Sequence, residues 1–401
     1  MKKFFCAALA ALMLASSFIS DAKGKDWVTT WATAIQIAEP HNCPPEPGLA
    51  GNSFRQIVQT SIGGSELRLH LSNFFNVDDT EIKGVEIAVA KTMGASPEIV
   101  EGTSVELTFN GSRNVTMKAG EAVVSDPVKF NVGERMNLAI TIHYGSISSK
   151  TITSHPGSRT TSYIAAGNTS DFSNPTAKTD HWYTIAAIDV MPKKASAAIC
   201  VLGDSITDGR GTTTNGQNRW TDQLSKSLLK DKKTKNLSVL NFGLGGNCVL
   251  RGGLGPYALS RYERDLFEQC GVKYIILFEG VNDLGGARDG MQTAEDLKAA
   301  WAKITEDAHS RGLKVICATV TPIIGNNYGR KEDHEQGRQA FNSWIRTCGI
   351  FDGVIDFDKM VSDPEIPNKL NPAFLFENDY LHLNAEGYDL MGSSIDHKLF
   401  R

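Results

Sequence analysis

A serine follows directly on an apolar run in the middle of the chain. The run Ala197 to Leu202 indicates a strand, and the segment Gly203-Asp-Ser205-Ile-Thr-Asp-Gly209 comes next. Such a strand would place Ser205 on a turn at its carboxyl end, which is where the active sites of α/β enzymes lie. A serine hydroxyl becomes a nucleophile only when a base takes its proton and donors stabilise the resulting oxyanion, so those partners must lie elsewhere in the chain.

Three further segments offer these partners. Asp379-Tyr-Leu-His382 lies near the C-terminus, Gly245-Gly246-Asn247 follows a second apolar run, and Gly280-Val-Asn282-Asp283 follows a third. His382 is the candidate base, and Asp379, three residues earlier, could hold its imidazole in one tautomer. The same aspartate could instead cap a helix that begins at Asn384. Asp283 and Asp204 are expected to hydrogen-bond locally rather than react.

In this order, the four segments resemble the sequence blocks of the SGNH (GDSL-type) serine esterase superfamily, over about residues 196 to 401. The resemblance implies a catalytic Ser205, His382 and Asp379. It also implies an oxyanion hole made by the backbone N–H groups of Ser205 and Gly246 and by the side-chain amide of Asn282. An acyl-enzyme mechanism of this kind uses no metal and no organic cofactor.

A finer resemblance, to a subfamily typified by an acylhydrolase or arylesterase encoded with xylan-degrading genes in a rumen bacterium, extends over nearly the whole chain. It rests on segments of both halves: Trp27-Val-Thr-Thr-Trp31, Leu67-Arg-Leu-His-Leu-Ser-Asn73, His155-Pro-Gly-Ser-Arg-Thr-Thr161, Gly246-Asn-Cys-Val-Leu250, Gly255-Pro-Tyr-Ala-Leu-Ser-Arg261 with Arg264-Asp265, and Glu279-Gly-Val-Asn-Asp283. The resemblance implies an exported esterase that removes acetyl or other small acyl groups from plant cell-wall polysaccharide. Two alternatives stay open: a broad-specificity aryl or short-chain esterase or lipase, and a carbohydrate-binding protein with an inactive hydrolase domain.

Other residues are candidates for contact with the substrate. Arg251 and Tyr257 follow the second block and could line the acyl or leaving-group pocket, whereas Glu279 ends a strand beside Asn282 and is either exposed to solvent or close to the cleft. His155 and His181-Trp182 in the first half could belong to a sugar-binding surface, although packing is the commoner role of such residues.

The first residues of the chain have the pattern of an export signal. Met1-Lys-Lys precedes a short apolar stretch, Phe4 to Ala15, and small residues precede a cleavage point expected after Ala22. We therefore expect a signal peptide over residues 1–22 and a periplasmic or secreted protein, with no other membrane span. The net charge of −4 gives no sign of nucleic-acid binding, and the oligomeric state and any cysteine pairing stay open.

The rest of the chain, residues 23–401, shows two different patterns of apolar residues, one after the other. Residues 23–194 contain short alternating runs such as Glu66–Ser72 and Met136–His143 between turn clusters, which predicts an all-β, jelly-roll-like sandwich. Residues 195–401 alternate strands with amphipathic helices, which predicts a three-layer α/β/α domain of the flavodoxin-like kind. Its strands are expected near 197–202, 237–243, 273–279, 314–320 and 353–357, and its helices at 220–229, 260–269, 293–310 and 337–346.

Overall fold

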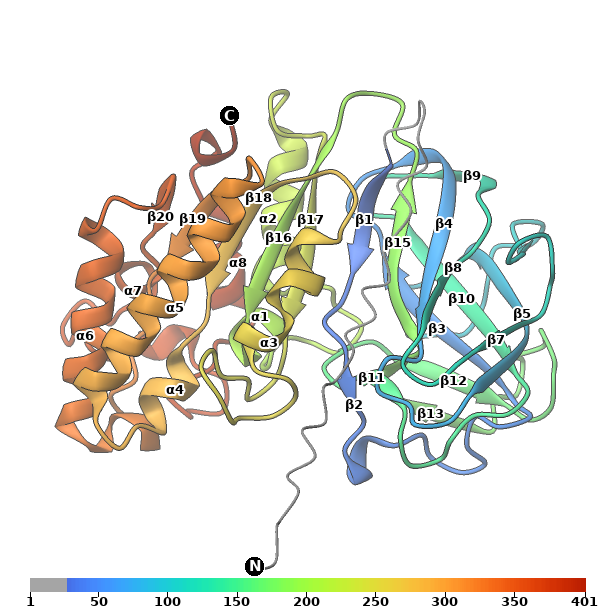
Figure 1. Cartoon of the computed structure of the whole chain (residues 1–401), viewed down its shortest axis with the longest axis horizontal. Coiled ribbons are helices and arrows are strands. Elements are labelled where there is room, and N and C mark those ends of the chain that lie inside the picture. Colours follow the sequence, from blue (N-terminus) through green and yellow to red (C-terminus); the bar gives the residue numbers. More distant parts are fainter. Residues whose placement is uncertain (1–26) are drawn as a thin grey trace, which may run out of the picture.

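The computed structural model describes residues 27–401, so the predicted signal peptide lies outside the described residues. Two bodies lie side by side: an all-β half formed by the first part of the chain and an α/β half formed by the second (Figure 1). The pairing changes from antiparallel to parallel between β15, which ends at Val190, and β16, which begins at Ala197. The domain boundary predicted near residue 194 falls in this connection and stays a prediction.

The first half consists of antiparallel sheets. Five strands form one sheet, in the order β1-β15-β4-β8 with β9 beside β4. Seven form a second, in the order β13-β12-β3-β10-β5-β6 with β7 beside β5, and β14-β11-β2 form a small third sheet. The strands are β1 (Val28–Ala32), β2 (Gln36–Ile37), β3 (Ser53–Gln59), β4 (Gly64–Ser72), β5 (Thr80–Val89), β6 (Val105–Leu107), β7 (Val115–Met117), β8 (Ala122–Val124), β9 (Val128–Val132), β10 (Asn137–Tyr144), β11 (Thr153–His155), β12 (Ser162–Ala165), β13 (Ala177–Thr179), β14 (Trp182–Tyr183) and β15 (Ile185–Val190).

Alternation along these strands explains the sandwich. In β4, Leu67, Leu69 and Leu71 are fully buried, and the residues between them are more exposed. Phe54 and Val58 of β3, on the larger sheet, belong to the same buried cluster. Two sheets that each present one apolar face bury those faces against each other, so the predicted all-β architecture is confirmed.

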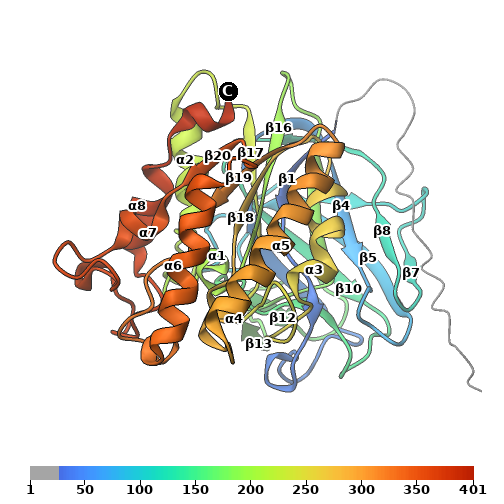
Figure 2. The same ribbon diagram turned by 60° about the vertical axis from the view of Figure 1, so that its left-hand side comes forward.

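The second half is built on a five-stranded parallel sheet in the order β17-β16-β18-β19-β20. Its strands are β16 (Ala197–Gly203), β17 (Leu237–Gly243), β18 (Val272–Phe278), β19 (Lys314–Ala318) and β20 (Gly353–Ile355), and its helices are α1 (Ser205–Asp208), α2 (Trp220–Lys230), α3 (Ala258–Tyr262), α4 (Val281–Gly285), α5 (Gly290–Ser310), α6 (Glu332–Thr347), α7 (Phe357–Val361) and α8 (Ala385–Ser393). In Figure 2, α5 and α6 lie together over one face of the sheet, and α2 packs with α8 away from them. The order of the strands is that of flavodoxin, and the predicted three-layer fold is confirmed.

Departures from the predicted elements are local. The predicted helix 260–269 is divided, because α3 ends at Tyr262 and a π-helical turn occupies Glu263–Phe267. The last strand ends at Ile355, two residues early, because Asp356 caps the N-terminus of α7 by accepting a hydrogen bond from the backbone N–H of Lys359.

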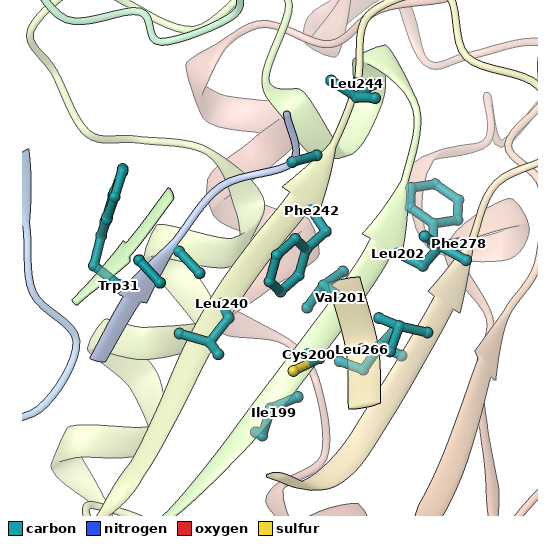
Figure 3. Packing of buried hydrophobic residues seen from close by; sticks show 14 of the residues in the cluster. Trp31, Ile199, Cys200, Val201, Leu202, Leu240, Phe242, Leu244, Leu266 and Phe278 are labelled. Carbon is teal, nitrogen blue, oxygen red and sulfur yellow. The ribbon is translucent and has the colours of Figure 1, made fainter. Parts of the chain in front are cut away.

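The two halves share one hydrophobic core. Figure 3 shows Trp31 of β1 in the cluster that Leu240 and Phe242 of β17 form with the apolar side chains of the central strand β16. A parallel β-bridge joins Thr33 to Asn241, and the backbone N–H of Val239 donates to Ser61 Oγ across 2.9 Å. The β half therefore packs directly along β17.

No helix among residues 27–401 is long and apolar enough to cross a bilayer. The six cysteines of this part of the chain are all free thiols, and Cys200 and Cys317 are buried in strands, as their apolar surroundings predict.

Candidate active site

Ser205 begins the short helix α1 at the carboxyl end of β16. Asp204 caps this turn by accepting a hydrogen bond from the backbone N–H of Ile206 across 3.0 Å, and Gly209 ends it with a φ of 96°. Glycine suits that end because a left-handed backbone is costly for other residues. The strand and turn thus place Ser205 at the carboxyl end of the parallel strands, as the sequence predicts.

A chain of hydrogen bonds links Ser205 to the last block. Ser205 Oγ lies 2.9 Å from Nε2 of His382, and Nδ1 of the same ring lies 2.6 Å from Oδ2 of Asp379. Ser205 and His382 are 6% and 8% exposed, so solvent reaches them only through the cleft. The structure therefore brings together three residues that are predicted to be catalytic and are up to 177 positions apart.

Asp379 is held by its own turn and not by the helix that follows. Its Oδ1 accepts hydrogen bonds from the backbone N–H groups of Leu381 and His382, at 2.9 and 2.8 Å. The helix α8 is capped by Asn384, which excludes the alternative role of Asp379 as its cap. Burial of Asp379 opposes ionisation, but the hydrogen bonds from His382 and the backbone outweigh it and lower the pKa of Asp379.

The expected oxyanion donors surround the same cleft. The cleft measures about 470 Å³ and is lined by Ser205, Gly246, Asn282 and His382, among others. Gly246 has a φ of 66°, and a Cβ there would lie 3.0 Å from the side chain of Leu254. Both the backbone conformation and the limited space favour glycine at this position.

Asn282 is fixed by two hydrogen bonds. Its Nδ2 donates to the backbone oxygen of Asn247 across 2.7 Å, and its Oδ1 accepts from the hydroxyl of Tyr328 across 2.9 Å. A carbonyl oxygen only accepts, so Nδ2 must face Asn247, and its second hydrogen stays available for a ligand. Tyr328 can pack here because residue 285 is glycine, where a Cβ would lie 2.1 Å from the ring.

Three acids near these blocks are buried or half-buried: Asp204, Glu279 and Asp283. Asp283 accepts hydrogen bonds from the backbone N–H groups of Val249 and Leu250, which is the local role expected for it. Burial raises the pKa of Asp283 to about 6 and that of Asp204 to about 7. Glu279 is 2% exposed, its Oε2 lies 3.4 Å from Nη2 of Arg261, and burial raises its pKa well above the ordinary value.

The three residues predicted to contact the substrate lie in different surroundings, and none of them lines the cleft around Ser205. Glu279 is buried and Tyr257 is exposed, and neither lines the cleft around Ser205. Arg251 lines a neighbouring groove of about 930 Å³ that shares Gly246, Asn282 and Tyr328 with the cleft. The roles of Arg251, Tyr257 and Glu279 in substrate binding stay predictions.

The β half supplies one wall of the cleft, through residues that are widely separated in the sequence. These are Gln36, Glu39, Asn42, Pro156, Gly157, Arg159, Asp180 and His181. His181 therefore reaches the cleft, whereas His155 is buried and stacks on Trp182 with 5.6 Å between ring centroids. Sequence reasoning also missed Asn326, whose Nδ2 donates to the backbone oxygen of Asp379 across 2.6 Å.

The parallel sheet, with Ser205, His382 and Asp379 joined at its carboxyl edge, has the architecture of an SGNH-type hydrolase domain. Residues 201–390 match the family described as GDSL-like lipase/acylhydrolase. These residues therefore form a GDSL-like lipase/acylhydrolase domain. No match was found among curated proteins.

Solved structures similar to this chain resemble about half of it. An acetyl xylan esterase from Geobacillus stearothermophilus is 18% identical with a TM-score of 0.39, and 51% of this chain and 95% of that one are covered. A carbohydrate acetylesterase from Sinorhizobium meliloti is 15% identical with a TM-score of 0.36, with coverage of 51% and 99%. A GDSL-like lipase from Bacteroides thetaiotaomicron is 22% identical with a TM-score of 0.37, with coverage of 51% and 87%.

Proposed function

We propose that the protein is a serine esterase that works through an acyl-enzyme. The observation that carries this proposal is the hydrogen-bonded chain from Ser205 Oγ through the His382 ring to Asp379. His382 takes the proton of Ser205 as Oγ attacks the ester carbonyl carbon, and Asp379 stabilises the imidazolium that forms. His382 then gives the proton to the leaving alkoxide, and a water molecule activated by the same ring releases the acid from Ser205.

The oxyanion of each tetrahedral intermediate needs donors that are already oriented. In the proposed mechanism these are the backbone N–H groups of Ser205 and Gly246 and the free hydrogen of the Asn282 amide. The two hydrogen bonds that fix Asn282 support its role, because an amide held before the reaction loses no freedom when charge develops.

We propose acetyl or another small acyl group on plant cell-wall polysaccharide as the substrate, and an exported protein as its catalyst. The cleft supports the first part, because most of the residues that line it are polar, charged or glycine, and its larger apolar side chains are those of Leu244, Leu254 and Leu381. A long fatty acyl chain would need a larger apolar surface. The basic and apolar start of the chain supports export.

Release of acetate from acetylated xylan by the purified protein tests this function, with Ser205→Ala as the blank. Release that disappears in Ser205→Ala would support deacetylation of polysaccharide. Hydrolysis of a small activated ester without release from xylan would move the assignment to the broad-specificity esterase. Failure of an organophosphonate to label Ser205 would reject the serine mechanism and favour an inactive, carbohydrate-binding scaffold.

A further inference from the structure

The turn that carries Ser205 is too short to be stable by itself. Helix α1 has four residues, and its last backbone bonds run from Gly209 N–H and Arg210 N–H to the carbonyl oxygen of Ser205, both at 2.9 Å. A single helical turn fixes many dihedral angles for few hydrogen bonds, so its geometry depends on tertiary contacts. Asp204 holds the first end from within the α/β half, and Asp208 occupies the last position.

Asp208 is held by the β half. Its Oδ1 accepts a hydrogen bond from Nε2 of His155 across 3.0 Å, and its Oδ2 lies 3.6 Å from Nη2 of Arg159. Asp208 and His155 are 2% and 4% exposed. Burial opposes ionisation of Asp208, but the charges of His155 and Arg159 outweigh it and lower the pKa of Asp208.

The segment that carries these two residues fits closely against Asp208. A Cβ on Gly157 would lie 1.9 Å from Oδ2 of Asp208, so the backbone at residue 157 touches the carboxylate. Arg219 of the α/β half donates to the backbone oxygens of Gly157 and Ser158, and also from Nε to the backbone oxygen of Asp208 across 2.9 Å. The close approach therefore leaves no room for a side chain at residue 157.

His155 is itself rigid. Its Nδ1 donates to the backbone oxygen of Ala34 across 2.8 Å, and its ring stacks on Trp182. The imidazole therefore has fixed neighbours within the β half and presents only Nε2 to Asp208. A displacement of this ring would therefore displace Asp208, the last residue of the turn that begins at Ser205.

We propose that His155 and Gly157 of the β half are positioning residues for the nucleophile and act on Ser205 through Asp208. The β half is then part of the esterase machinery and not an appended module. This inference rests on the proposed function, because its effect is read at Ser205. It gives the segment His155-Pro-Gly-Ser-Arg-Thr-Thr161 a positioning role, in place of the sugar-binding surface suggested for His155, which is buried.

The variant His155→Phe tests the proposal, because phenylalanine keeps an aromatic ring against Trp182 and removes both hydrogen bonds. We expect kcat on 4-nitrophenyl acetate to fall by about 10- to 100-fold, with KM changed less than about twofold, since a displaced nucleophile costs rate and not binding. The rate of organophosphonate labelling of Ser205 is expected to fall by a similar factor.

Ser61→Ala is the matched control. Ser61 is also a buried residue of the β half, and its Oγ bonds Ser225 Oγ at 3.0 Å and the backbone N–H of Val239, away from the Ser205 turn. Its loss should lower thermal stability and leave kcat and labelling unchanged. If His155→Phe behaves like Ser61→Ala, losing stability but keeping kcat, the positioning role is wrong.

If His155→Phe does not fold, two further variants test whether the β half positions Ser205 through Asp208. Asp208→Asn keeps the shape of the side chain but weakens its bonds to His155 and Arg159, and Gly157→Ala pushes a methyl group against the carboxylate. Both should lower kcat and the labelling rate with KM retained, and full activity in both would overturn the proposal. A wild-type protein that neither turns over nor labels would instead reject the proposed function, so the two failures are distinct.

Discussion

Tyr328 donates its hydroxyl hydrogen to Oδ1 of Asn282 across 2.9 Å, from a 3-10 turn that spans Asn327–Arg330. The same loop holds Asp379, through Asn326. One loop between β19 and α6 therefore contacts both the side-chain amide of Asn282 and the backbone of Asp379. The relative positions of these two groups depend on that loop.

Replacing Tyr328 by phenylalanine should slow turnover. The ring still fits over Gly285, but Oδ1 of Asn282 loses its donor and the amide gains freedom to rotate. We expect kcat to fall by about 2- to 10-fold with little change in KM, the range set by one hydrogen bond. Tyr262→Phe, which removes a 2.6 Å hydrogen bond to Asp307, is the control and should keep kcat. Equal rates in the two variants would show that Tyr328 does not orient Asn282.

Removing the amide itself should have a larger effect. Asn282→Ala takes away one donor to the oxyanion, and such donors typically contribute about 100-fold or more in rate. Because the oxyanion exists only along the reaction path, steady-state kinetics should show the loss in kcat and not in KM. An unchanged kcat would remove Asn282 from the oxyanion hole.

Arg251 should affect long substrates only. It lines a groove that shares Gly246 and Asn282 with the cleft, so we expect a polysaccharide bound at Ser205 to extend to it and a small ester not to. In Arg251→Ala we expect KM for acetylated xylo-oligosaccharides to rise by about 2- to 5-fold, the scale of an exposed polar contact. The KM for 4-nitrophenyl acetate should not change. A parallel rise for both esters would place Arg251 in a general structural role.

Glu279 should make stability decrease as the pH rises. An unfolded glutamate loses its proton near pH 4.5, whereas burial of Glu279 raises its pKa well above that value, with Arg261 lowering it by less. Unfolding above pH 4.5 therefore releases this proton, which costs stability by up to about 1.4 kcal/mol for each pH unit. Glu279→Gln has no proton to release, so its stability relative to the wild type should be greater at pH 8 than at pH 5. Urea unfolding at both values measures this, and an identical difference at pH 5 and pH 8 would contradict it.

Most of the fold could be predicted from local patterns of apolar residues in the sequence. The short apolar run of β16, which ends at turn residues, and the alternation in β4 both favour strands, so the strands and both architectures could be predicted. The grouping of Ser205, His382 and Asp379 came from resemblance, because no local pattern relates positions 177 apart.

The contacts that the sequence did not reveal join distant segments. Tyr328 and Asn282 are 46 positions apart, and His155 and Asp208 are 53 apart and belong to different halves. A histidine before Pro156-Gly157 has many possible surroundings, and only the packing of the two halves selects one. The glycine at residue 157 was a usable signal of close approach, but it does not say which side chain approaches.

The packing of β1 and Ser61 against β17 also covers part of an edge strand. β17 is the outermost strand of the parallel sheet, and an uncovered edge strand offers its unpaired backbone groups to strands of other molecules. Here the Thr33–Asn241 bridge and Ser61 Oγ occupy part of that edge. An α/β half released by proteolysis near residue 194 would expose it, and light scattering of that fragment should show aggregation that the intact protein lacks.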